Sequence, residues 1–248
     1  MLRPATIALL ALVLLQSVPA SAGADEGIPR EQVQFAKGAS SATVSGSLKG
    51  DTTVDYVVRA AAGQTLTVRL QKSNPQNYFN VMPPESAGGA MFTGTASDEY
   101  SGVLPDDGDY VLRVYLMRAA ARRGESSKYS LDIGVSGQPL APIPASQDAL
   151  LPGTRYHAAS AVRCVPAYES AERDCEANVV RRGADGTATV VVPAKTGTRS
   201  ILFVKGRPVA SNAAGMDALS FERRDDTTIV RLGDSERYEI PDALIFGG

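Results

Sequence analysis

Apolar and polar residues alternate along several short segments of this chain, which is the pattern of half-buried β-strands. In residues 110–117, Tyr110, Leu112, Val114 and Leu116 alternate with Val111, Arg113, Tyr115 and Met117, and residues 129–135 repeat the period of two. Residues 105–109 (Pro-Asp-Asp-Gly-Asp) come before the first run and favour a tight turn. The two runs are therefore predicted to be a strand and its antiparallel return partner, at the centre of a β-rich region.

Shorter runs of the same kind extend this region toward the N-terminus. They lie at 44–48, 55–59, 65–71 and 78–82, with turn residues between them. Residues 86–102 are small and polar, and Phe92 and Tyr100 are the predicted core contacts there. Short strands at this spacing predict a jelly-roll-like antiparallel β-sandwich domain for residues 25–135.

The rest of the chain predicts a connection and a second β domain. Residues 136–153 contain four prolines and little charge, so they form either a semi-rigid linker or a connection wrapped on the fold. Residues 154–248 hold further short strands and no helical period. The chain is thus predicted to be all-β, with a small antiparallel β-barrel or curled sheet in its second half.

Residues 1–24 have the pattern of a secretory signal peptide. Arg3 provides a positive start, residues 7–15 are apolar, and residues 19–22 suit cleavage. No later run is long and apolar enough to span a membrane, and no Cys follows the apolar run to carry a lipid. The predicted location is the periplasm, with secretion as the alternative.

Composition narrows the classes of function. The net charge of −2 and the lack of a basic tract argue against a nucleic-acid partner, because neutralising phosphates requires clustered cations. The one histidine, His157, is predicted to be a hydrogen-bonded or exposed strand residue and not a catalyst. Residues 106–109 lack the spaced ligands of a calcium loop. We therefore expect a protein without enzymatic activity, cofactor or metal.

The two cysteines, Cys164 and Cys175, are expected to form a disulfide. An even number of cysteines in an exported chain favours a disulfide over a catalytic thiol. Acidic residues on both sides of Cys175 would raise a thiol pKa and disfavour a reactive thiolate. A two-ligand metal site is the weaker alternative, because no His or third Cys stands nearby. A bond across this short loop is worth about 2–4 kcal/mol.

The segment between the two central strands, residues 118–125, carries three arginines. Hairpin loops usually have about 2–5 residues, so this longer one suggests a function. One helical turn would place Arg118 and Arg122 on the same face. One interpretation is a solvated polar loop in which Arg123 pairs with Glu125. The other is a cationic probe for carboxylates in a partner's cleft, because arginine binds carboxylates in a bidentate manner.

Motifs in the first half carry a family resemblance. Gly50-Asp51, Ala62-Gly63-Gln64-Thr65-Leu66 and Gly108-Asp109-Tyr110 resemble a bacterial pre-peptidase C-terminal-type β-sandwich. More narrowly, Asn77-Tyr78-Phe79-Asn80, Arg113-Val114-Tyr115, and Met117-Arg118 with Arg122-Arg123 resemble the periplasmic inhibitors of goose-type lysozyme. Those inhibitors have a single domain, whereas this chain continues well past the sandwich.

The resemblance implies a binding protein that inhibits a lysozyme-type muramidase, with the goose type favoured, through the Arg-bearing hairpin loop. Tyr78 and Asn80 would flank this loop. The expected partner-binding residues are Arg118, Arg122, Arg123, Tyr78, Asn80 and Tyr115. The alternative function is an envelope adaptor that binds glycan, such as peptidoglycan, or protein without inhibiting an enzyme.

The second half resembles an uncharacterised domain of exported proteobacterial proteins. The matching features include the two cysteines, Val180-Arg181-Arg182 and residues 236–248. This resemblance implies no activity for the second half.

Overall fold

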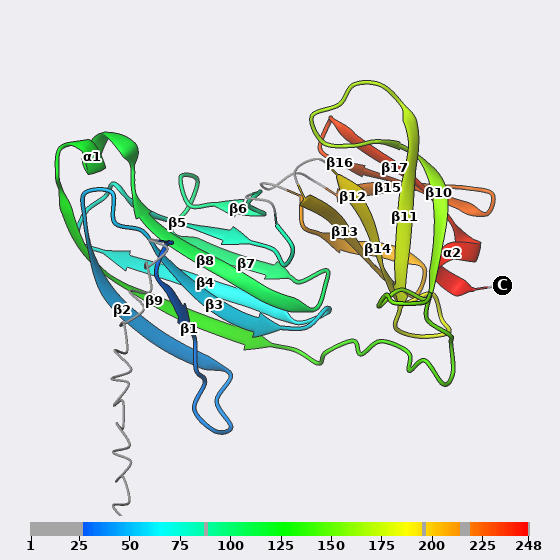
Figure 1. The fold of residues 1–248 in the computed structure, drawn as a ribbon, viewed down its shortest axis with the longest axis horizontal. Helices are drawn as coiled ribbons and strands as arrows, with labels where there is room; N and C mark the ends of the chain where they lie inside the picture. The colour runs from blue at the N-terminus through cyan, green and yellow to red at the C-terminus, as the bar shows by residue number, and fades with distance from the viewer. Residues whose placement is uncertain (1–26, 87–88, 195–196, 214–218, 248) are drawn as a thin grey trace, which may run out of the picture.

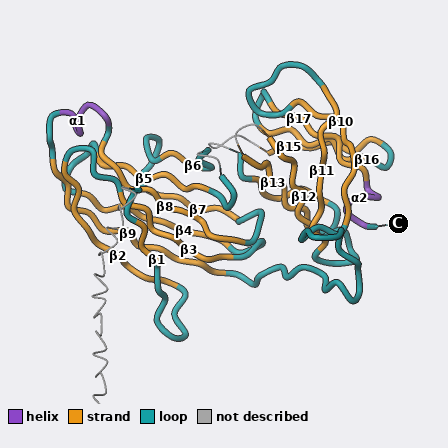
Figure 2. Tube along the Cα trace, viewed as in Figure 1, coloured by secondary structure: helices purple, strands orange, loops and turns teal. Residues whose placement is uncertain are grey.

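The computed structural model describes residues 27–86, 89–194, 197–213 and 219–247, which fold almost entirely into β-strands (Figures 1 and 2). The predicted signal peptide, residues 1–24, lies outside the described residues. The elements in chain order are β1 (Arg30–Gln32), β2 (Ser41–Lys49), β3 (Val54–Ala60), β4 (Thr65–Lys72), β5 (Asn77–Met82), β6 (Phe92–Thr93), β7 (Glu99–Val103), β8 (Gly108–Leu116), α1 (Arg118–Arg122), β9 (Ser126–Ser136), β10 (Ala158–Val165), β11 (Arg173–Arg181), β12 (Ala188–Ala194), β13 (Gly197–Val204), β14 (Arg207–Ser211), β15 (Leu219–Arg224), β16 (Thr227–Leu232), β17 (Glu236–Pro241) and α2 (Asp242–Phe246). Neither of the helices among the described residues is long and apolar enough to cross a membrane.

Strands β1–β9 form two sheets that share one apolar core, as predicted for a β-sandwich. One sheet has the order β1-β3-β8-β5-β6, and the other has the order β2-β9-β4-β7. Paired strands are antiparallel except β1 and β3, which run parallel. The alternation in β8 buries Tyr110, Leu112 and Val114, which lie in the same core as Leu131 and Ile133 of β9.

The two sheets correct one prediction, the pairing of the two central strands. β8 pairs with β3 and β5, whereas β9 pairs with β2 and β4 in the other sheet. The Arg-bearing segment is therefore a crossover between sheets and not a hairpin loop. Packed sheets lie about 10 Å apart, which explains why this connection is longer than a hairpin turn.

The sequence pattern does not predict β1 or β7. β7 lies in the small, polar segment and is held in the sheet by antiparallel pairing with β4. Tyr100 of β7 and Phe92 of β6 do make the predicted core contacts, and their ring centroids are 5.2 Å apart. In this segment, pairing with a neighbouring strand overrides a weak local preference.

Strands β10–β17 form one eight-stranded antiparallel sheet that curls into a nearly closed barrel, which confirms the predicted barrel or curled sheet. The order is β14-β13-β12-β11-β10-β17-β16-β15. The two edge strands approach each other where the guanidinium of Arg207 lies 5.3 Å from the ring centre of Phe221. Cys164 of β10 and Cys175 of β11 form the predicted disulfide.

Several buried apolar side chains of the barrel and the sandwich lie outside both apolar cores. Val180, Val191 and Leu202 of the barrel are buried, yet they belong to neither of the two apolar cores. The same holds for Ala62 and Val111 of the sandwich. We interpret these residues as the apolar part of the contact between the two regions.

Asp106 and Asp107, in the turn before β8, form the polar part of this contact. Asp106 is 4% exposed and accepts two hydrogen bonds of 2.8 Å from Arg155. Asp107 Oδ2 lies 2.8 Å from Nη2 of Arg182, whose side chain is fully buried. The predicted turn is present, and it also connects the two β regions. We call the contact of Asp106 and Asp107 with Arg155 and Arg182 the joint.

Residues 137–157 are wrapped on both regions. Leu140 N donates to Ala62 O of the sandwich at 2.9 Å, and Ile143 N donates to Arg181 O of the barrel at 2.8 Å. Of the two alternatives, the wrapped connection therefore fits the structure. The division of the chain into domains at 136–153 stays a prediction.

Candidate functional site

The connection between β8 and β9 contains the predicted helical turn, α1. Ala120 on the inner side of this turn is fully buried and anchors it on the sandwich. Gly124 follows with a φ of 69°, a left-handed conformation that glycine adopts easily and that ends the turn. Arg118 and Arg122 are exposed, four residues apart, as expected for one face of a helix.

Arg118 and Arg122 differ from the other arginines in their surroundings. Among the arginines that the structure describes, these two alone have neither an acidic partner nor an aromatic ring in contact. A guanidinium without an internal partner keeps its N–H donors available for another molecule. α1 therefore presents two free cations on one fixed turn.

Arg123 instead belongs to the scaffold of the loop. Its Nε donates to Glu125 Oε1 at 2.7 Å, and Asn74 Nδ2 donates to Glu125 Oε2 at 2.9 Å. The hydrogen bonds from Asn74 and Arg123 lower the pKa of Glu125, because they stabilise its charged form. The interpretation of a polar loop with internal pairing thus applies to Arg123 and not to the other two arginines.

Tyr78, Asn80 and Tyr115 lie together on the outer face of the five-stranded sheet, and we call them the tyrosine patch. Tyr78 of β5 is directly opposite Tyr115 of β8, with 6.3 Å between ring centroids. The Tyr115 hydroxyl donates to Asn80 Oδ1 at 3.2 Å, and burial raises the Tyr115 pKa. Lys72 Nζ lies 4.7 Å from the centre of the Tyr78 ring. The sequence pattern gave no signal for this lysine.

The tyrosine patch borders α1 without touching its free arginines. Tyr115 stands three residues before Arg118 in the chain, at the end of β8 that leads into the helical turn. Among the described residues, no hydrogen bond, ion pair or ring contact links the patch to Arg118 or Arg122. The structure therefore brings the predicted site residues to one end of the sandwich, but it does not join them in one contact network.

α1 and the joint lie at opposite ends of β8 (Figure 1). β8 has nine residues, so its two ends are about 30 Å apart at the usual rise of a strand. The barrel is held at the far end and leaves α1 uncovered (Figure 1).

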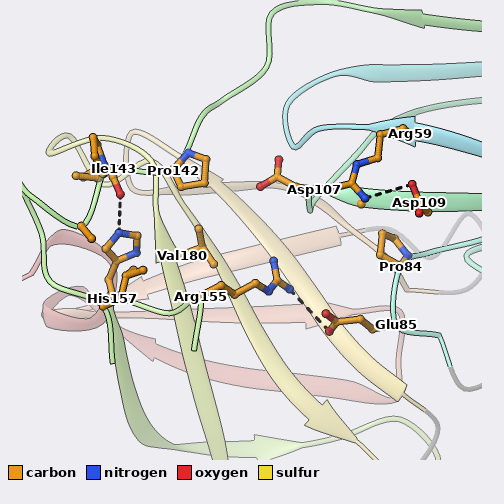
Figure 3. Close-up of a pocket in the computed structure, with 14 residues that line it drawn as sticks. Arg59, Pro84, Glu85, Asp107, Asp109, Pro142, Ile143, Arg155, His157 and Val180 are labelled. Atoms are coloured by element: carbon orange, nitrogen blue, oxygen red, sulfur yellow. Dashed lines mark hydrogen bonds and ion pairs between the residues drawn. The ribbon is translucent and has the colours of Figure 1, made fainter. Parts of the chain in front are cut away.

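A cleft of about 700 Å³ lies beside the joint, between the sandwich, the wrapped connection and the barrel (Figure 3). Arg59 Nη1 and Asp109 Oδ1 are 3.2 Å apart on its rim, and Arg155 Nη2 lies 3.8 Å from Glu85 Oε2. These charged groups already have internal partners. The cleft is therefore a weaker candidate for binding a charged partner than α1 is.

His157, in the wall of this cleft, has a structural role. Its Nε2 lies 2.9 Å from Ile143 O, and its Nδ1 accepts a hydrogen bond of 3.0 Å from Arg181 N. Both bonds form only when the neutral ring carries its proton on Nε2, since the carbonyl can only accept and the amide can only donate. The predicted hydrogen-bonded histidine is therefore present, although it is buried and stands just before β10 instead of in a strand.

Metal ligands do not gather anywhere in the described parts of the chain. No group of three or more His, Cys, Asp or Glu side chains lies there in a position to hold a metal ion.

The N-terminal half of the chain is similar to known inhibitors of lysozyme. It is 32% identical over 129 residues to an inhibitor of g-type lysozyme from Escherichia coli (strain K12), covering 52% of this chain and 93% of the relative. The crystal structure of the periplasmic inhibitor of g-type lysozyme from Aeromonas hydrophila is 38% identical, with a TM-score of 0.40, and covers 44% of this chain and 96% of that one. The Salmonella Typhimurium inhibitor is 30% identical, with a TM-score of 0.34, and covers 44% and 98%. No family model matches the chain.

Proposed function

Because this chain belongs, through its N-terminal half, to the family of the inhibitors of g-type lysozyme, we propose that it is a periplasmic, non-enzymatic inhibitor of such a lysozyme. We propose further that α1 is the part that enters the cleft of the enzyme. The observation that carries this assignment is the pair Arg118 and Arg122, which are exposed and have no internal acidic partner among the described residues.

The chemistry of a muramidase cleft suits these two arginines. Glycosidases work with carboxylates beside the scissile bond, so their clefts present negative charge in a partly desolvated groove. Arginine binds a carboxylate with two parallel hydrogen bonds and stays charged at every relevant pH, whereas lysine gives only a point contact. Since Arg118 and Arg122 lie on one helical turn, their backbone is already ordered, and binding has to order only the two side chains.

Charge alone does not make such a complex stable. Removing both partners of an ion pair from water offsets much of their attraction. The inhibitor therefore also needs apolar contact around α1, and the tyrosine patch beside it supplies the rings of Tyr78 and Tyr115. Tyrosine is suited to this role because it has a large apolar face and a polar tip.

Single alanine substitutions on α1 test the proposal. Arg118→Ala and Arg122→Ala should each raise the inhibition constant by the equivalent of about 2–5 kcal/mol if the pair is buried in the complex, and by less than about 1 kcal/mol if it stays at the rim. Arg123→Ala should have a smaller effect, because Glu125 already holds Arg123. Inhibition constants against a purified g-type lysozyme provide the measurement.

A matched control separates the site from general charge. Arg69 is 63% exposed on the outer face of the other sheet, so Arg69→Ala removes the same charge away from α1 and should leave inhibition unchanged. If the wild-type protein leaves g-type lysozyme fully active at micromolar excess, the proposal is wrong. Tight binding to peptidoglycan in that case would support the envelope adaptor instead.

A further inference from the structure

The open edge of β2 is a second interaction surface, independent of α1. β2 has nine residues and stands at the border of the four-stranded sheet, with β9 on one side (Figure 1). Within the described residues, no strand pairs with its other side. An unpaired edge presents N–H and C=O groups that another strand can bind.

The register identifies the backbone groups of β2 that face the open side. Val135 N donates to Ser40 O at 2.8 Å, and the pairing of Ser41 with Gly134 continues this register. Since bonded positions alternate along an antiparallel pair, the even-numbered residues of β2 bond to β9. The N–H and C=O groups at positions 41, 43, 45 and 47 therefore point to the open side, and the side chains there are exposed.

The other edges among the described strands are protected in ways that β2 is not. β1, β6 and β7 have only three, two and five residues. β14 contains Pro208, and β15 carries Glu222, Arg223 and Arg224. Short length, proline and charge are the features by which natural sheets avoid pairing edge to edge. β2 has none of them before Lys49, its last residue.

We propose that two copies of this protein associate by antiparallel pairing of β2 with β2, about a two-fold axis at Ser45. In this register Ser45 lies opposite its own copy, Thr43 lies opposite Ser47, and Ser41 lies opposite Lys49. No like charges face each other, and the small side chains let the backbones approach. The pairing joins two four-stranded sheets into one continuous sheet, and the two-fold symmetry closes the assembly.

The core-facing side chains of β2 favour a second copy of the chain as the partner of this edge. Ala42 and Val44 pack on the sandwich core and are partly buried at its border. In the proposed register Val44 lies opposite Gly46, where the Tyr129 ring of that copy occupies the place of a side chain. A second copy would therefore cover apolar surface as well as pair the backbone.

The proposed dimer leaves both α1 segments open. The Lys49 end of β2 leads into Gly50, whose N–H donates to Glu125 O in the α1 connection at 2.9 Å. Antiparallel pairing directs these two ends away from each other along strands of about 30 Å. Each copy can then bind its own partner, so association and inhibition are separable.

Sedimentation of the protein lacking the signal peptide, with the Cys164–Cys175 disulfide intact, tests the proposal. A single edge-to-edge contact is smaller than a standard interface, so we expect dimers at about 100 µM and monomers at low micromolar concentration. Ser45→Pro removes an N–H that points to the open edge and breaks no bond to β9. Ser45→Lys places two like charges opposite each other. Each variant should raise the dissociation constant of the dimer by about tenfold or more.

Ser101→Lys, at the β7 edge of the same sheet, is the matched control and should dimerise like the wild type. Ser45→Cys should give a covalent dimer under mild oxidation, whereas Ser101→Cys should not. The melting temperature of each variant checks that it is folded. Two results would overturn the proposal. One is a wild-type protein that stays monomeric at about 100 µM, and the other is a Ser45→Pro variant that dimerises as well as the wild type. Unchanged lysozyme inhibition by Ser45→Pro would show that the two surfaces act independently.

Discussion

Neutralising Asp106 should destabilise the whole protein while leaving its proposed inhibitory site intact. Asp106→Asn keeps the shape of the side chain but removes the charge that Arg155 and Arg182 face. Asp106 is 4% exposed and accepts two hydrogen bonds of 2.8 Å from Arg155, one of 3.3 Å from Ser200 Oγ, and a local one from Asp107 N. The amide can replace only part of this acceptor set.

The size of the effect follows from the burial of the partners. Removing one member of a buried ion pair destabilises a protein by about 3–5 kcal/mol. Arg155 is 36% exposed and can regain water, whereas the Arg182 side chain is fully buried but keeps Asp107 as a partner. We therefore expect a smaller loss, of about 2–3 kcal/mol, which corresponds to roughly 5–10 °C in melting temperature for a protein of this size.

Calorimetry and an inhibition assay together provide the test. Because the joint couples the barrel to the sandwich, the wild type should unfold in one transition, and Asp106→Asn should lower or split that transition. The inhibition constant should stay unchanged, since α1 lies at the other end of β8. A melting temperature within 1 °C of the wild type (about 0.3–0.5 kcal/mol) would refute the reasoning. A large loss of inhibition with the fold intact would contradict the separation of the two ends.

Three further predictions concern single features. Above pH 4.5, the ordinary pKa of glutamate, the ionised Glu125 carboxylate stabilises the α1 connection through the hydrogen bonds that lower its pKa. The free energy of unfolding should therefore fall as the pH drops from 4.5 through the lowered pKa, and Glu125→Gln should flatten that part of its pH dependence. Reducing the Cys164–Cys175 disulfide should lower the free energy of barrel opening by about 2–4 kcal/mol, measured by hydrogen exchange, and sandwich amides should lose protection only where they exchange through unfolding of the whole protein. Gly46→Ala should destabilise the sandwich by about 1–3 kcal/mol in urea unfolding, because its Cβ would lie 2.6 Å from the Tyr129 hydroxyl; a neutral result would show that Tyr129 can move.

Local sequence determined the strands and one helical turn of the proposed site. The alternation along β8 fixes which side chains face the core, since successive residues of a strand point to opposite sides. The distance between Arg118 and Arg122 fixes their common face once a helical turn forms. The even number of cysteines and the acidic residues around Cys175 likewise indicate a Cys164–Cys175 disulfide from the sequence alone.

Tertiary structure alone decided the partners of these elements. Alternation indicates which face of a strand is buried but not which strand lies beside it, so the pattern predicts β8 and β9 as a pair although they lie in different sheets. Asp106 has the sequence features of an exposed turn residue, and only the docking of the barrel brings Arg155, 49 positions away, onto its carboxylate. That no acidic side chain among the described residues pairs with Arg118 or Arg122 is also a property of the folded chain. Local preferences act over a few residues, whereas these contacts depend on how surfaces distant in sequence fit together.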